Sequence, residues 1–326
     1  MFFLLYPLKF EPVYKSILWG GRNIGKKFNR NIPNGNIAES WEVCCREDGM
    51  SLVSNGELKG LSLQELMDTY KEDLLGKKYD YFPLLIKIID ANDKLSVQVH
   101  PNDEQAKKGN GQNGKTEMWY VFDSKPGAKL IYGLKEGITK SEFEEAIKNS
   151  TVEDTLKEVP VKPGDSFYMP SGTVHAILDG ILVAEIQQNS NTTYRVYDWN
   201  RVDKNGNPRE LHIDKALDVI DFSGEKLKNA ERQISSSSTN IDNPLYAKKV
   251  LASSEYFTVE ELSIKQNYTK NTNGDKFYIY MTVEGEGSID YKGTSLDIKP
   301  GDTIMIPACL GEFSISGNLK LLEVFI

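Results

Sequence analysis

Short runs in which apolar and polar residues alternate, or in which β-branched and aromatic residues concentrate, fill most of the chain and are separated by Gly, Pro, Asn and Asp. Such runs predict strands, because successive side chains of a strand point to opposite faces of a sheet. We therefore expect a mainly β protein with mostly antiparallel strands. The clearest strands are predicted at Phe82–Ile89, Leu95–Val99, Met118–Phe122, Leu182–Gln187, Lys276–Val283 and Leu319–Ile326.

Helical periodicity is confined to three stretches, residues 62–75, 140–149 and 152–157. Ser62 and Glu65 have the spacing of a capping box at the start of the first stretch. Because these stretches are short and lie in the N-terminal half, we expect them to be insertions on a β core.

One ten-residue motif occurs twice, as VKPGDSFYMP at Val161–Pro170 and as IKPGDTIMIP at Ile298–Pro307. Pro-Gly-Asp predicts a tight turn, the next four residues a strand, and the final proline its end. The repeat implies two homologous β units. The polar stretch Ser235–Pro244 is the best linker candidate, so we place the domains at residues 1–234 and 245–326.

Composition and charge exclude several classes of protein. The 326 residues carry a net charge of −8 without a long basic run, which argues against nucleic acid as a partner. No stretch approaches the roughly 18 apolar residues of a membrane span. The apolar residues 1–6 are predicted to be a core strand and not a signal peptide. Three cysteines, two of them adjacent, cannot form a disulfide framework, so we expect a cytoplasmic location.

Three histidines are present, His100, His175 and His212. In the segment Leu95–Pro101 the alternation puts Ser96, Gln98 and His100 on one face of a strand. Polar side chains inside a β core need partners, because burying one unpaired costs about 1 to 3 kcal/mol. By itself, each histidine is most simply a hydrogen-bonded structural residue, and we expect His212 to be one.

The first copy of the repeated motif resembles the second motif of the cupin superfamily, in which a metal-binding histidine follows the proline. Pro170, Gly172 and His175 have that spacing. The second copy has Glu312 at the place of His175, and no histidine follows His212. We therefore expect a cupin domain with a metal in the N-terminal part, and a degenerate cupin barrel without a metal in the C-terminal part.

A metal would satisfy the oxygen of Gln98 and a ring nitrogen of His100 together. Glu117 on the following predicted strand can add a carboxylate and His175 a second imidazole. Two imidazoles and two oxygens make a plausible zinc set with room for water or substrate.

Four segments resemble type I mannose-6-phosphate isomerase, in its short bacterial form, in order and approximate spacing. The resemblance spans nearly the whole chain and begins with LWGG at 18–21 and AESW at 38–41. It implies two cupin-type (jelly-roll) β-barrels and a zinc-dependent aldose–ketose isomerase that interconverts mannose 6-phosphate and fructose 6-phosphate through a cis-enediolate. The four segments are 95–101, 114–120, 172–176 and 194–195.

The resemblance also implies roles for single residues. Gln98, His100, Glu117 and His175 would bind one zinc ion per chain, and Arg195 would be the active-site arginine, which could stabilise the enediolate or bind phosphate.

Two lysines, at 87 and 115, match lysines that face the pocket in relatives. Lys115 precedes Glu117 by two residues, hence lies on the same strand face, and is a candidate proton carrier. Lys87 interrupts the apolar run 84–89, and we expect it to contact the substrate phosphate together with Ser96.

Two positions depart from the family pattern. Some relatives have a histidine, proposed to help open the sugar ring, where this chain has Gly114, and relatives have an aspartate where it has Asn191. The ring-opening and proton-transfer groups therefore stay open. Another metal cupin enzyme, such as an iron dioxygenase or an epimerase, is less compatible with Gln98. A phosphosugar sensor without turnover is the non-enzymatic alternative. The oligomeric state and the role of the C-terminal barrel do not follow from the sequence.

Overall fold

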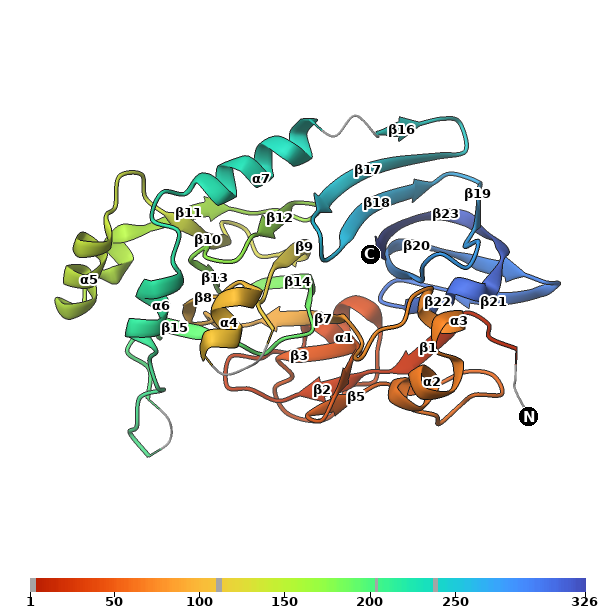
Figure 1. The fold of residues 1–326 in the computed structure, drawn as a ribbon, viewed down its shortest axis with the longest axis horizontal. Coiled ribbons are helices and arrows are strands. Elements are labelled where there is room, and N and C mark those ends of the chain that lie inside the picture. Colours follow the sequence, from red (N-terminus) through yellow and green to blue (C-terminus); the bar gives the residue numbers. More distant parts are fainter. Residues whose placement is uncertain (1–3, 110–112, 203–204, 237–239) are drawn as a thin grey trace. The chain divides into compact units, whose positions relative to one another are not determined.

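The computed structural model describes residues 4–109, 113–202, 205–236 and 240–326. The protein is mainly β with few helices, and its strands pair antiparallel, as predicted (Figure 1). The helices of the described residues are α1 (Asn23–Phe28), α2 (Leu63–Tyr70), α3 (Glu72–Leu75), α4 (Asp103–Gly109), α5 (Lys140–Lys148), α6 (Ile213–Val219) and α7 (Glu225–Ser236).

Two of the three predicted helical stretches are confirmed, by α2 with α3 and by α5. The third prediction, a helical stretch at residues 152–157, was partly wrong. Residues 152–155 form a single 3-10 turn, and strand β11 begins at Leu156. The remaining helices, α1, α4, α6 and α7, were not predicted.

The chain forms two compact units. One consists of residues 14–40 and 87–233, and the other of residues 1–13, 41–86 and 234–326. The sequence predicted one division at 235–244, whereas the contacts group two N-terminal segments with the C-terminal part. In the predicted linker, α7 extends to Ser236, residues 237–239 lie outside the described residues, and β16 (Ile241–Asp242) follows.

Two sheets build the unit of residues 14–40 and 87–233 around a shared apolar core. Trp119 and Val183 from one sheet pack with Leu130 and Ile177 from the other. One sheet has the order β11-β10-β13-β8-β15 and the other β12-β9-β14-β7-β3-β2. Their strands are β2 (Val13–Lys15), β3 (Glu39–Val43), β7 (Leu84–Ala91), β8 (Val97–Val99), β9 (Glu117–Ser124), β10 (Lys129–Leu134), β11 (Leu156–Pro160), β12 (Ser166–Met169), β13 (His175–Ile177), β14 (Ile181–Gln188) and β15 (Tyr194–Tyr197).

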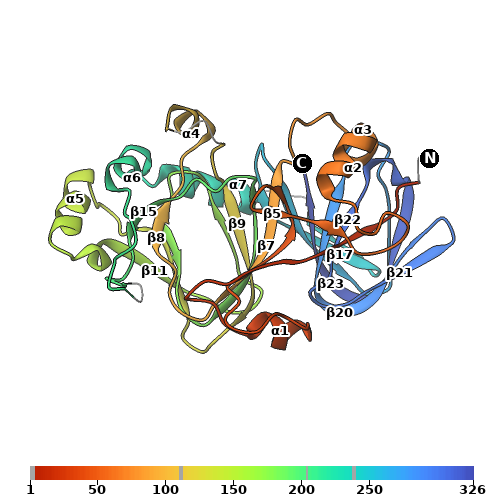
Figure 2. The same ribbon diagram turned by 90° about the horizontal axis from the view of Figure 1, so that it is seen from below.

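Helices α5 and α6 cover the outer face of the first of these sheets (Figure 2). Phe143 of α5 and Ala216 of α6 pack against Val97, Val99 and Val196 of β8 and β15. The inner face of the sheet is thereby left to carry the polar residues of the site.

The other unit contains one large sheet in the order β16-β17-β18-β23-β20-β22-β1-β6, with β19 on β23 and β21 on β20. Its core is apolar and includes Leu262, Tyr280, Ile304 and Leu321. In the described residues none of the three large sheets closes on itself, so two separate barrels stay a prediction. The strands are β1 (Leu8–Glu11), β6 (Leu52–Val53), β17 (Tyr246–Ser253), β18 (Thr258–Ile264), β19 (Asn267–Asn271), β20 (Tyr278–Tyr291), β21 (Thr294–Ile298), β22 (Thr303–Ile306) and β23 (Glu312–Phe325); β4 (Cys45–Arg46) and β5 (Gly49–Met50) form a separate pair.

The two copies of the Pro-Gly-Asp motif fold alike. Gly164 and Gly301 both have positive φ, +92° and +88°, which favours glycine. Asp165 and Asp302 each accept a hydrogen bond from the backbone N–H three residues earlier, at 2.9 and 3.1 Å. The strand after each turn, β12 or β22, pairs with β9 or β20. The sequence repeat is therefore also a structural repeat.

The N-terminal strand begins later than predicted. Residues 1–3 lie outside the described residues, and Leu4–Pro7 have no strand structure. Leu5 is buried but Leu4 is 69% exposed, and β1 begins at Leu8. In the described part of the chain no helix is long and apolar enough to cross a membrane.

Candidate metal centre

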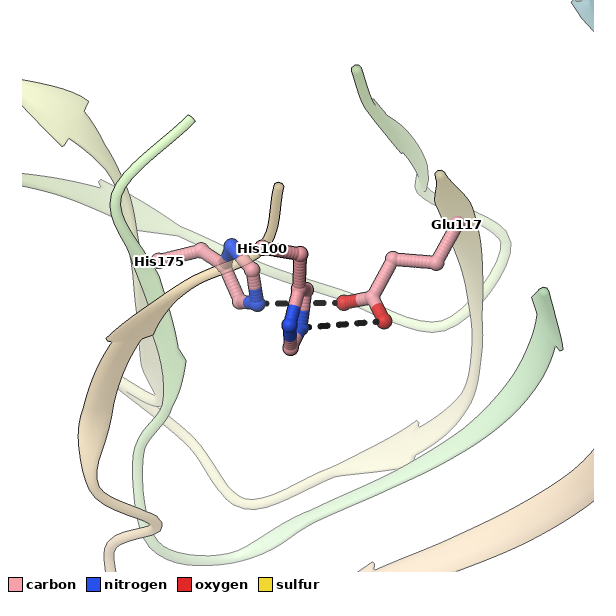
Figure 3. A group of neighbouring side chains, drawn as sticks. All are labelled: His100, Glu117 and His175. Atoms are coloured by element: carbon pink, nitrogen blue, oxygen red, sulfur yellow. Dashed lines mark ion pairs between the residues drawn. The ribbon is translucent and has the colours of Figure 1, made fainter. Parts of the chain in front are cut away.

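Three predicted metal ligands, which lie at the ends of three strands, point toward one another (Figure 3). His100 follows β8, Glu117 begins β9 and His175 begins β13. One ligand atom from each lies within 4.8 Å of the others, and all three residues are buried. Nε2 of His175 is 3.1 Å from Oε1 of Glu117, and Nε2 of His100 is 3.6 Å from Oε2.

Strand pairing explains why residues far apart in sequence meet. His175 lies opposite Gln98 where β13 pairs with β8, and Glu117 lies opposite Met169 where β9 pairs with β12. Nε2 of Gln98 is 3.5 Å from Nε2 of His175. Rotation of this amide would turn its oxygen toward the same point, so the fourth predicted ligand is also within reach.

The outer ring nitrogens of both histidines are hydrogen-bonded to backbone carbonyls. Nδ1 of His100 donates to the oxygen of Thr192 at 2.8 Å, and Nδ1 of His175 donates to the oxygen of Thr173 at 2.9 Å. Both rings therefore turn Nε2 toward Glu117, with Nδ1 held by the backbone as in metal-binding histidines.

The electrostatics favour a neutral His100 beside an ionised carboxylate. Burial and the ammonium of Lys115 hold the pKa of His100 well below its usual range. Burial raises the pKa of Glu117, but Lys115, His175 and His100 outweigh it and hold the pKa well below its usual range. Oε1 of Glu117 is buried without a hydrogen-bond partner in the described residues and lies 3.1 Å from Nε2 of His175, so a cation bound here would satisfy the carboxylate. These residues fit a divalent metal such as zinc.

Two buried lysines lie beside these ligands and share one carboxylate. Nζ of Lys115 contacts Oε2 of Glu117, lies 3.1 Å from Nε2 of His100, and lies 3.5 Å from Oε1 of Glu185. Nζ of Lys87 lies 3.0 Å from the same Glu185 oxygen. Lysines from β7 and from the segment just before β9 are therefore joined through one residue of β14.

Lys87 contacts two carboxylates. Its ammonium is 3.4 Å from Oε2 of Glu39 and 3.0 Å from Oε1 of Glu185. Burial lowers the pKa of Lys87, but Glu185 and Glu39 outweigh burial and raise it above the usual value. Lys87 is therefore a permanently charged group in this pocket.

Glu185 was missed in the sequence. Its other carboxylate oxygen accepts a hydrogen bond from Nε1 of Trp119 at 2.8 Å, so both oxygens are engaged. The sequence did mark this residue, because Glu185 is the one charged residue in the strand ILVAEIQQ, which is buried throughout. The same argument drew attention to Lys87.

Arg195 lies on β15 directly opposite Gln98 of β8. Its Nε donates to Oγ of Ser96 at 3.2 Å, and its Nη1 donates to the carbonyl of Glu210 at 2.7 Å. The Nδ1 atom of His212 accepts from the backbone N–H of Arg195 at 3.2 Å, so His212 supports β15. Ser96 thus contacts Arg195. Lys87, which we expect to bind the substrate phosphate together with Ser96, contacts Glu39 and Glu185.

Gly114 has no room for a side chain. A Cβ at this position would lie 2.4 Å from the backbone carbon of Asn102 and 2.5 Å from the backbone nitrogen of Asp103. The N–H of Gly114 also donates to Oδ1 of Asp103 at 2.7 Å. A histidine could not occupy this position without a backbone shift.

The chain is similar to known proteins over nearly its whole length. Residues 7–131 match the family model described as "Phosphomannose isomerase type I, catalytic domain", and residues 247–326 match "Mannose-6-phosphate isomerase, cupin domain". The chain is 40% identical to mannose-6-phosphate isomerase ManA of Bacillus subtilis, over 95% of this chain and 96% of that one. It is 36% identical to mannose-6-phosphate isomerase of Streptococcus mutans, over 97% of both. A crystal structure of mannose 6-phosphate isomerase from Bacillus subtilis matches 98% of this chain and 99% of that one, with a TM-score of 0.85 and 34% identity.

Proposed function

The chain belongs to the type I mannose-6-phosphate isomerase family of aldose–ketose isomerases, and from that premise we propose that it interconverts mannose 6-phosphate and fructose 6-phosphate with one bound zinc ion. The observation that carries the proposal is the buried cluster of His100, Glu117 and His175 beside two buried lysines. A charged, water-poor pocket of this kind suits a reaction that moves protons and passes through an anion.

The residues that would hold the zinc are Gln98, His100, Glu117 and His175. When bound, the ion would supply a Lewis acid that lowers the energy of the negative charge on the two adjacent oxygens of a cis-enediolate. The hydrogen bonds from Nδ1 of both histidines to backbone carbonyls fix the ring orientations for this task.

Lys115 is the proposed proton carrier between C2 and C1 of the sugar. It is 5% exposed, and its ammonium lies among Glu117, His100 and Glu185. A proton carrier must be held within reach of both carbons, and Glu185 holds the ammonium while its second oxygen is fixed by Trp119. Glu185 is thus proposed as the residue that positions Lys115 and accepts protons from it.

Arg195, Ser96 and Lys87 are proposed to bind the anionic substrate. The guanidinium of Arg195 and the hydroxyl of Ser96 are in contact and can bind a phosphate or an enediolate oxygen together. The permanently charged Lys87 lies next to Glu185 and can bind a sugar oxygen on that side.

For the fold, we propose two cupin-type barrels of which the first alone binds metal. The two Pro-Gly-Asp hairpins have matching turns and matching strand pairs. Where the first copy is followed by His175, the second is followed by Glu312 at the start of β23, and this residue is exposed. We retain 235–244 as the proposed linker between the repeats.

The test is conversion of mannose 6-phosphate to fructose 6-phosphate by purified protein, before chelation, after chelation and after zinc is added back. We expect turnover that chelation removes and zinc restores. Arg195→Ala should lower kcat/KM by roughly 10²- to 10³-fold, whereas Arg232→Ala, which changes an exposed arginine of α7, should not. Metal-loaded, folded protein without turnover would contradict the proposal and favour a phosphosugar sensor.

A further inference from the structure

A cavity of about 410 Å³ is lined by the end of β10, by the two residues before His175 and by the first turns of α7. It belongs entirely to the unit of residues 14–40 and 87–233. Its lining contains none of the proposed metal ligands and none of the proposed substrate-binding residues. The cavity therefore adjoins the metal centre without containing it, and the carbonyl of its lining residue Thr173 accepts from His175.

A glycine bulge creates the space. The register of β10 against β11 shifts between Ile131 and Leu134. Within this bulge Gly133 has a φ of +89°, and its N–H donates to the carbonyl of Val174 at 2.8 Å. A Cβ at Gly133 would already lie 3.5 Å from Cδ2 of Leu227 in α7. The bulge thus turns the strand away from the helix and leaves a hollow with an apolar floor.

Thr173 presents a polar group to this hollow. Its side chain lines the cavity although the residue is only 7% exposed. In the described part of the chain its hydroxyl has no hydrogen-bond partner. This hydroxyl is therefore available to hydrogen-bond to a molecule bound in the cavity.

The rim of the cavity offers hydrogen-bonding groups without net charge. Three lysines and three carboxylates line it, so their formal charges cancel. Phe222, Leu134 and Leu227 supply an aromatic and aliphatic wall. The charged residues are Lys135, Lys157, Lys228, Glu136, Asp221 and Glu231.

We propose that this cavity binds the ring of a neutral, unphosphorylated sugar. The C–H face of a pyranose is apolar and would pack against Phe222 and Leu227, while its hydroxyls would bind Thr173 and the charged rim. Because the charges of the rim cancel, the site gives a phosphate group no advantage. This distinguishes it from the pocket of Lys87, Lys115 and Arg195.

The experiment uses metal-loaded full-length protein and methyl α-D-mannopyranoside as the probe, with binding measured by saturation-transfer NMR in saturating fructose 6-phosphate. We expect binding that Leu227→Trp, which fills the cavity, weakens by at least about tenfold. Thr173→Val should weaken it roughly two- to tenfold through loss of one hydrogen bond. Leu245→Trp, at an exposed leucine, is the control and should leave binding unchanged.

Three results would overturn the proposal: no binding to the wild-type protein, unchanged binding to both cavity variants, or tighter binding of phenyl phosphate than of the glycoside in the same cavity. Isomerase turnover of Leu227→Trp, measured in parallel, reports on the metal centre independently. Circular dichroism of each variant shows whether it is folded. Failure of the cavity proposal is thereby distinct from failure of the proposed function.

Discussion

At the scale of single residues, Glu185 is the carboxylate that joins the two buried lysines of the site. One of its oxygens lies 3.0 Å from the ammonium of Lys87 and 3.5 Å from that of Lys115, and the other accepts from Trp119. Its neutral amide analogue would keep the size of the side chain and lose the charge. The ammonium groups of Lys87 and Lys115 would then each lose one ion-pair partner within a buried pocket.

We therefore expect Glu185→Gln to lower kcat by roughly 10²- to 10⁴-fold, the range for loss of a group that acts in proton transfer. Bound zinc should stay at one ion per chain, because Glu185 is not among the ligands. Steady-state kinetics and metal analysis of the same preparation check both expectations. Glu158→Gln, at an exposed carboxylate of β11, is the control. Loss of zinc from Glu185→Gln would show that the residue acts on the metal site instead.

The cluster of His100, Glu117 and His175 could be predicted from the sequence, whereas the contacts of Glu185 could not, for a physical reason. Histidine is scarce in this chain, and strand alternation places His100 on the same face as Gln98. The partners of Glu185, in contrast, come from different strands, and their meeting depends on the register of β14 with β9 and on its pairing with β7. Sequence periodicity predicts which side chains share a face of a strand, but it does not predict which strand pairs with it.

At the scale of elements, both helical predictions that the structure confirms begin with a capping box. Ser62 accepts from the backbone N–H of Glu65, whose carboxylate accepts from the backbone N–H of Ser62, and Thr139 and Glu142 do the same in α5. Helix α1 has only six residues, and its first N–H groups are bound by Asp90, which is distant in the sequence. Such an element depends on tertiary contacts, here the buried Ile24 and Phe28. Local pattern therefore could not predict it.

Removal of the cap at α2 should cost stability. We expect Ser62→Ala to lower the free energy of unfolding by about 1 kcal/mol, since the N–H of Glu65 loses its acceptor at 3.2 Å. Thr69→Ala, at an exposed position of the same helix, is the matched control and should be neutral or slightly stabilising. Urea unfolding followed by circular dichroism measures both. Equal effects of the two substitutions would contradict a capping role.

At the scale of the whole molecule, the two repeats keep one polar pair in common. Glu185 lies opposite Trp119 in the pairing of β14 with β9, and Glu323 lies opposite Tyr280 in the pairing of β23 with β20. Each carboxylate accepts a hydrogen bond from its aromatic partner, at 2.8 and 2.5 Å. Trp119 and Tyr280 also lie opposite matching positions of the two motif strands, Phe167 and Ile304. The second repeat therefore retains a buried acid at the same place without the metal ligands.

In the second repeat this acid is fully engaged by neighbours of its own unit. Glu323 is not exposed to solvent, and two ammonium groups, of Lys248 and Lys270, each lie 2.5 Å from it. Burial raises the pKa of Glu323, but Lys270 and Lys248 outweigh burial and lower it to about 2. Burial and Glu323 in turn raise the pKa of the neighbouring Glu260. This closed network suggests a structural role in place of catalysis.

Glu323→Gln tests that role through both stability and pH. Loss of one partner from a buried ion-pair network costs roughly 3 to 5 kcal/mol, and we expect such a decrease in the free energy of unfolding at pH 7. Because the pKa of Glu323 is lower in the folded chain than in the unfolded one, its contribution is complete above pH 4.5 and is lost as the pH falls toward 2. The difference in the free energy of unfolding between wild type and variant should therefore narrow below pH 4.5.

Urea unfolding between pH 3 and pH 7 measures this difference, with Glu286→Gln, at an exposed carboxylate of β20, as the control. Isomerase activity of the folded variant should persist, since Glu323 contacts none of the proposed catalytic residues. A difference independent of pH would show that the carboxylate stabilises this unit by packing and not by its charge.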